Sequence, residues 1–210
     1  MQQLFNILSK ALSTMLHPLF MPTYGMGLYM VAMRMRIQQL PSVYILIGLA
    51  VTFVLTTLIP IILILILRKR GTISSIYIDE AHERTIPYIY TLICFGFWCY
   101  FVGATLKMPT VWLVVAIGAT IALLFVTIIN HWWKISAHLT ALGGLLGGIC
   151  SLALYYSTLP TTLIIGIMII SLLLMCARIY LNAHTPLQVI CGFVLGILCT
   201  FIPNLITYHA

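Results

Sequence analysis

Apolar runs long enough to cross a lipid bilayer recur along this chain. Of its 210 residues, 62% are hydrophobic and only 6% are charged. A spanning helix needs about 20 predominantly apolar residues. Because lipid satisfies no backbone hydrogen bonds, segments of this kind fold as helices that pack on one another. The sequence therefore predicts an all-α, polytopic transmembrane helix bundle in which residues 1–210 form a single domain.

Seven spans can be placed along the sequence. They are expected near residues 12–33, 43–67, 86–106, 110–130, 136–157, 161–177 and 186–207. The first is interrupted by His17, Pro18 and Pro22, so the alternative is a partly interfacial first segment followed by six spans. The same prolines, and the lack of a clear small-residue cleavage site, disfavour a signal sequence near Lys10. We expect an uncleaved first segment.

Composition and short motifs exclude several functional classes. The net charge is +7, but most Lys and Arg residues fall at span ends, where anionic headgroups attract them. The lipid bilayer is therefore an expected partner, and nucleic acid is not. The six cysteines lie in apolar runs without a CxxC pair, so neither a zinc site nor a disulfide framework is indicated. Without an HExxH motif, a phosphate loop or a carboxylate pair, we expect a metal-independent site without a cofactor, and no obligate protein partner.

Two short segments place ionisable side chains next to long apolar runs. They are Lys134-Ile-Ser-Ala-His138 and Arg178-Ile-Tyr-Leu-Asn-Ala-His184. A charge at the bilayer centre costs about 2.5–3.5 kcal/mol on insertion scales, so such groups are candidates for function. By span parity, both segments and Arg84 emerge at the same membrane face.

Glycine spacing predicts that the two helices that follow these segments pack closely. The helix that opens near His138 contains Gly143, Gly144, Gly147 and Gly148, and the last span contains Gly192 and Gly196. Small residues four apart let membrane helices approach backbone to backbone. Lys134 and His138 are also four apart, so they share a helix face if the helix begins early enough.

The same segments resemble the type 2 phosphatidic acid phosphatase family, which shares its fold core with vanadium haloperoxidases and bacterial acid phosphatases. The family's third motif is Ser-Arg, five residues, His, three residues, Asp; here it reads Ala177-Arg178, five residues, His184, three residues, Gln188. The second motif, Pro-Ser-Gly-His, appears as residues 135–138, Ile-Ser-Ala-His. The first, Lys, six residues, Arg-Pro, is matched only loosely by Arg84, with Pro87 three residues on and Tyr77 in place of the Lys. The resemblance covers about residues 68–196.

This resemblance implies a role for each position. His184 would attack phosphorus and carry a phosphohistidine, while His138 would protonate the leaving group and later activate water. Gln188 would accept a hydrogen bond from the Nδ1–H of His184 without supplying the charge of the family's Asp, which implies a slow enzyme. The expected phosphate-binding groups are the side chains of Arg84, Arg178 and Lys134 and the backbone N–H groups of Ser136 and Ala137.

We therefore expect an integral membrane phosphatase that acts on a lipid phosphate monoester or pyrophosphate. The headgroup would enter at a membrane face while the acyl or prenyl chain stays in the bilayer. The alternatives are a lipid phosphotransferase on the same fold, and a transporter or lipid-binding protein with an anion site and no chemistry. The count of positive residues favours a cytoplasmic site, but many bacterial relatives face outward. The expectation is a bacterial inner-membrane protein with an extracytoplasmic site.

Overall fold

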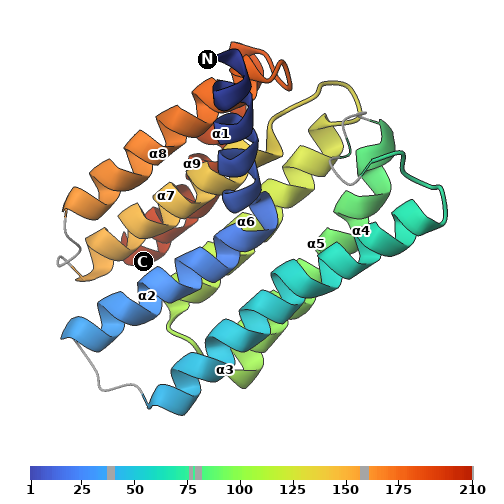
Figure 1. Ribbon diagram of the computed structural model, residues 1–210. Coiled ribbons are helices and arrows are strands. Elements are labelled where there is room, and N and C mark those ends of the chain that lie inside the picture. Colours follow the sequence, from blue (N-terminus) through green and yellow to red (C-terminus); the bar gives the residue numbers. More distant parts are fainter. Residues whose placement is uncertain (37–40, 76–77, 79–81, 157–160, 210) are drawn as a thin grey trace.

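The computed structural model describes residues 1–36, 41–75, 78, 82–156 and 161–209, which form helices joined by loops, with no strand among them (Figure 1). Six of these helices are long and apolar enough to cross a bilayer. They are α3–η2–α4 (Ser42–Lys69), α5–η4 (Thr85–Thr105), α6 (Thr110–Ile129), α7 (Ala137–Tyr156), α8 (Thr161–Tyr180) and α9 (Pro186–His209). The protein is thus an all-α, polytopic membrane protein. The six spans expected after residue 40 are confirmed, and the largest shift of a boundary is from 177 to Tyr180.

The first predicted span, 12–33, is wrong as a single helix. The chain forms α1 (Gln2–Met15), a short 3-10 turn η1 (Pro18–Phe20) and α2 (Met21–Arg36). His17 is extended, with φ −64° and ψ 139°, because a residue that precedes proline disfavours the helical region. The 16 residues of α2 rise only about 24 Å, less than the hydrocarbon thickness of about 30 Å. The count of six spans is therefore the one that the structure supports.

Two threonines, Thr56 and Thr57, donate hydrogen bonds from the first long span to η1. The hydroxyl of Thr57 donates to the carbonyl of Leu19 at 2.7 Å, and both residues are buried. Thr57 lies in η2 (Val54–Leu58), a π-helical turn that ends two residues before Pro60. Proline has no N–H to continue the α-helical ladder, which is a common cause of such an irregular turn. The turn positions the N-terminal segment against the bundle.

The α1 helix lies across the end of α8. The ring of Phe5 lies 6.2 Å from that of Tyr180, and the Tyr180 hydroxyl donates to the Gln2 carbonyl at 3.4 Å. Figure 1 shows α1 running obliquely to the long helices. Its residues Leu4, Phe5, Ile7 and Leu8 are exposed. An apolar, exposed face on a helix outside the spans is typical of a helix that lies in the membrane interface.

The α7 and α9 helices pack backbone against backbone. A Cβ atom built on Gly192 would lie 2.7 Å from the carbonyl oxygen of Ser136, and one on Gly196 would lie 2.6 Å from the amide nitrogen of Gly144. A Cβ on Gly147 would lie 2.8 Å from the Ile197 carbonyl oxygen. Side chains larger than hydrogen do not fit at these positions. The close packing predicted from the glycine spacing is present, and it brings the starts of the two helices together.

We expect Gly196→Ala to destabilise the protein, because its methyl group meets backbone atoms that cannot move aside. Overpacking of this kind costs about 1–3 kcal/mol. The matched control is Gly166→Ala on α8, where a built Cβ has no atom within 4 Å. Thermal unfolding in detergent should show a lower Tm for Gly196→Ala and an unchanged or higher Tm for the control. Equal Tm values would contradict the close contact between α7 and α9.

Candidate functional site

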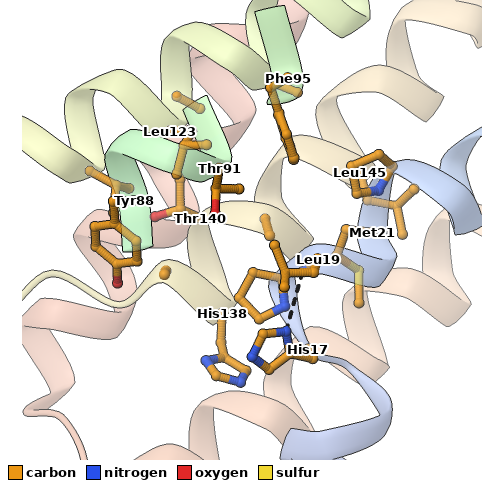
Figure 2. A pocket seen from close by; sticks show the side chains of 18 of the residues that line it. His17, Leu19, Met21, Tyr88, Thr91, Phe95, Leu123, His138, Thr140 and Leu145 are labelled. Carbon is orange, nitrogen blue, oxygen red and sulfur yellow. Dashed lines mark hydrogen bonds between the residues drawn. The ribbon is translucent and has the colours of Figure 1, made fainter. Parts of the chain in front are cut away.

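A cavity of about 170 Å³ opens between the N-terminal segment and helices α5, α6 and α7. Charged and imidazole side chains line one end of it, and these are His17, Arg84, His138, Arg178 and His184. Figure 2 shows His17 and His138 side by side, with Phe95 and Leu145 farther into the bundle. Four of the predicted site side chains, those of Arg84, His138, Arg178 and His184, are therefore brought together from three separate parts of the sequence, and Ala137 also lines this cavity.

His184 lies in the turn between α8 and α9, and two oxygens hold one nitrogen of its ring. Its Nδ1 lies 3.1 Å from the carbonyl oxygen of Lys134 and 3.1 Å from Oε1 of Gln188. A backbone carbonyl only accepts hydrogen bonds, so Nδ1 carries the proton and donates it. In the neutral ring the lone pair then sits on Nε2. This tautomer is the one that a nucleophilic His184 requires.

Gln188 is itself fixed by the start of α9. Its Oε1 accepts from the N–H of Thr185 at 3.1 Å, and the Thr185 hydroxyl accepts from the N–H of Gln188 at 3.4 Å. This reciprocal pair is a capping box. Because an N–H group faces the amide from Thr185, the oxygen and not the nitrogen of Gln188 points toward this group and His184. The amide therefore acts as an oriented acceptor.

His138 and His17 form a pair of imidazoles. Nε2 of His138, in the first turn of α7, lies 3.2 Å from the carbonyl oxygen of Ser13 in α1, so this nitrogen donates. The two rings lie 5.4 Å apart at an interplanar angle of 80°. Nδ1 of His17 accepts from the Leu19 N–H at 3.4 Å. His17 was not among the predicted site residues; the signal that could have indicated it was its place beside the prolines that break the first segment.

The charged end of the cavity is cationic. Arg84 is only 6% exposed, and its Nε donates to the Ile78 carbonyl at 2.8 Å. Arg178 also lines the cavity, and none of the described lining residues is Asp or Glu. Two guanidinium groups in such surroundings favour an anion with several oxygens, such as phosphate.

Burial, followed by the charges of Arg178 and Arg84, lowers the pKa of His184 to about 4, although its hydrogen bonds to Gln188 and Lys134 act in the opposite direction. Burial, followed by the charge of Arg178, lowers the pKa of His17 to about 4. Both imidazoles are therefore neutral at physiological pH. A neutral ring is the form that can act as a nucleophile.

Two of the predicted phosphate-binding residues, Lys134 and Ser136, use main-chain groups to hold other residues of the site. The α7 helix begins at Ala137, so Lys134 lies in the preceding turn and does not share a helix face with His138. Its carbonyl reaches His184, while its side chain is not among the described residues that line the cavity. The N–H of Ser136 donates to the Gln188 carbonyl at 3.3 Å and is not available to an anion. A phosphate-binding role for the Lys134 ammonium group stays a prediction.

The loosely matched first motif, around residues 77–87, lies partly at the cavity. Pro87 lines it, as does Tyr88, which the sequence did not single out. Tyr77 lies outside the described residues. Within the part of the chain that the structure describes, no group of three or more His, Cys, Asp or Glu residues could hold a metal ion.

Comparisons with protein-family models, with curated proteins and with solved structures found no match. The likeness to type 2 phosphatidic acid phosphatases therefore rests on the residues of the two linked motifs. The fold and the cavity define a polytopic membrane protein with a cationic cavity.

We expect His184 to stay neutral in substrate-free protein until the pH falls to about 4. Histidine NMR titration measures this pKa directly. Gln188→Leu should lower the pKa of His184 further, because it removes a hydrogen bond that favours the imidazolium. Gln188→Glu should raise this pKa, because it adds a negative charge.

The low pKa of His184 also makes stability depend on pH. Since the pKa of a histidine in the unfolded chain is about 6.5, the unfolded chain binds more protons than the folded protein between pH 6.5 and 4. The free energy of unfolding should therefore decrease as the pH is lowered from 6.5 to 4. A titration midpoint near 6.5 would contradict the buried, cationic site.

Proposed function

We propose that this protein is an integral membrane phosphatase that hydrolyses a lipid phosphate monoester or pyrophosphate through a phosphohistidine at His184. One observation carries the proposal. The Nδ1–H of His184 is held by two oxygens, which leaves a lone pair on Nε2 in a cavity that also contains two arginines. The resemblance of both motifs to the phosphatase family supports the same assignment.

In the first step the arginine side chains bind the phosphate oxygens, and Nε2 of His184 attacks phosphorus. A P–N bond forms while the bond from phosphorus to the leaving oxygen breaks. Charge on the equatorial oxygens is stabilised by Arg84 and Arg178. The phosphorylated ring carries a positive charge, which the oxygens of Gln188 and Lys134 stabilise through the Nδ1–H that they already accept.

His138 is the proposed general acid. Its Nε2–H donates to the Ser13 carbonyl, so proton transfer takes place at Nδ1. The negative charge of the bound phosphate favours the imidazolium, so Nδ1 takes up a proton from water when the substrate binds and gives it to the departing oxygen. In the second step the same nitrogen takes a proton from water as the water attacks phosphorus, the P–N bond breaks, and His184 and inorganic phosphate are released.

The rest of the cavity suits an amphiphilic substrate. Beyond the charged end its lining is largely apolar, with residues such as Phe95, Trp98 and Leu145. A phosphate group and an attached hydrocarbon therefore each meet a complementary environment.

A phosphotransferase would share the first step and differ only in the acceptor of the phosphoryl group in the second step. Release of inorganic phosphate, measured against transfer to an added alcohol, separates the two.

We expect His184→Ala to abolish turnover, because the P–N bond cannot form. Rapid acid-free quenching of the parent protein with a phosphorus-labelled lipid phosphate should trap a label that is stable to alkali and lost in acid, as a phosphoramidate is. The control is His131→Ala, since His131 is exposed and does not line the cavity. Phosphate release by the His184 variant at the parent rate would refute a phosphohistidine. Binding of the lipid phosphate without any release would favour a transporter or binding protein.

We expect His138→Ala to slow turnover by about 10²–10⁴-fold for substrates with poor leaving groups, the usual range for loss of a general acid. Aryl phosphates, whose leaving groups need no proton, should be affected much less. His17→Ala should cause a smaller loss that does not depend on the leaving group. The measurement is kcat across a series of leaving-group pKa values. The opposite ranking of the two variants would assign proton transfer to His17.

A further inference from the structure

We infer that the cavity receives a single hydrocarbon chain of the substrate inside the helix bundle, so that the site selects lipid phosphates with one slender chain. This inference rests on the proposed function and deepens it. It differs from the expectation that the chain stays in the bilayer. Three features of the cavity carry it, namely its depth, its width and its closed end.

The depth follows from the lining residues on two helices. On α5 they extend from Pro87, three residues after Arg84, to Trp98, and on α6 from Val126 to Trp112. Each stretch from the charged end, 84 to 98 and 126 to 112, rises through fourteen residue steps, or about 21 Å at 1.5 Å per residue. One leaflet of a bilayer is about 15 Å deep in hydrocarbon. The lining residues therefore extend from the charged end through the depth of one leaflet.

The width admits one chain. The cavity is about 170 Å³, and Ala119 and Ala122 of α6 line its middle. An apolar cavity of roughly 150 Å³ already holds one small ligand. The two chains of a diacyl lipid have no room side by side in such a volume, so a chain that enters the cavity is single and slender.

Buried tryptophans close the far end. Trp98 and Trp112 are 1% and 2% exposed, and they lie farthest from the arginines along α5 and α6. The indole N–H of Trp98 donates to Thr52 Oγ1 at 3.0 Å, and Trp112 stacks on Tyr29 with ring centroids 5.0 Å apart. These contacts fix the end wall. A fixed wall sets an upper limit to the length of chain that the cavity accepts.

The test uses linear alkyl monophosphates of increasing chain length, kept below the concentration at which they aggregate. Equilibrium binding and phosphate release are measured on the same purified protein. Affinity should rise by up to about fourfold for each added methylene, the equivalent of burying one such group, until the chain meets the tryptophans, and then stop rising. In mixed micelles, a diacyl phosphatidate should be turned over more slowly than the single-chain lipid with the same acyl group.

The substitution Ala119→Leu should shorten the chain length at which affinity stops rising, because its side chain fills the middle of the cavity. The matched control is Gly96→Leu on α5, where the residue is exposed and a built Cβ has no atom within 4 Å. Trp112→Leu should move the limit in the other direction, which keeps the test decisive if Ala119→Leu does not fold.

The two proposals fail in different ways. The chain site is the part of the cavity that receives the hydrocarbon chain. If the parent, Ala119→Leu and Trp112→Leu all release phosphate with the same dependence on chain length, the chain site is overturned and the phosphatase proposal stands. Binding that depends on chain length and responds to both variants, without phosphate release, would support the chain site and refute the phosphatase. Equal turnover of single-chain and two-chain lipids would also overturn the chain site.

Discussion

The contact between the backbones of α7 and α9 is the constraint on which the candidate site depends. Glycines let these helices approach so closely that the loops before them bond to each other. The Ser136 N–H donates to the Gln188 carbonyl, and the His184 ring donates to the Lys134 carbonyl. Each motif therefore supplies main-chain groups that position a residue of the other. A change in the distance between the helices would therefore alter the hydrogen bond from His184 to the Lys134 carbonyl.

Sequence patterns predicted the features that depend on residues near each other in the chain. The apolar runs located six spans, and glycine spacing located their closest packing. The patterns failed where a distant contact decides the outcome. His17 joins the site because Pro18 breaks the first segment and because Thr57 bonds the Leu19 carbonyl, and no local periodicity reveals that bond. Lys134 was assigned by its charge, but the structure brings its carbonyl to His184, and a sequence motif gives no information on main-chain groups.

Gln188 occupies the position at which the motif of the resembled phosphatase family has an acid, and under the proposed function this difference has two opposite effects. A neutral amide adds no negative charge to the cavity that Arg84 and Arg178 line, which would favour binding of a phosphate dianion. The same amide would stabilise a positively charged phosphohistidine less than a carboxylate does. In that proposal, binding and chemistry make opposite demands on position 188. Its capping box with Thr185 gives this residue a further role in the start of α9, independent of either demand.

The bond between His138 and α1 connects the interior of the site to the membrane surface. The Ser13 carbonyl orients this imidazole, yet it belongs to a helix outside the six spans whose exposed residues include Leu4, Phe5, Ile7 and Leu8. Because α1 exposes apolar residues where a bilayer surface would lie, we expect its position to respond to the lipid around it. Detergent in place of lipid, or a bulky fusion at the N-terminus, would then act on the hydrogen-bond partner of His138 without touching the six spans.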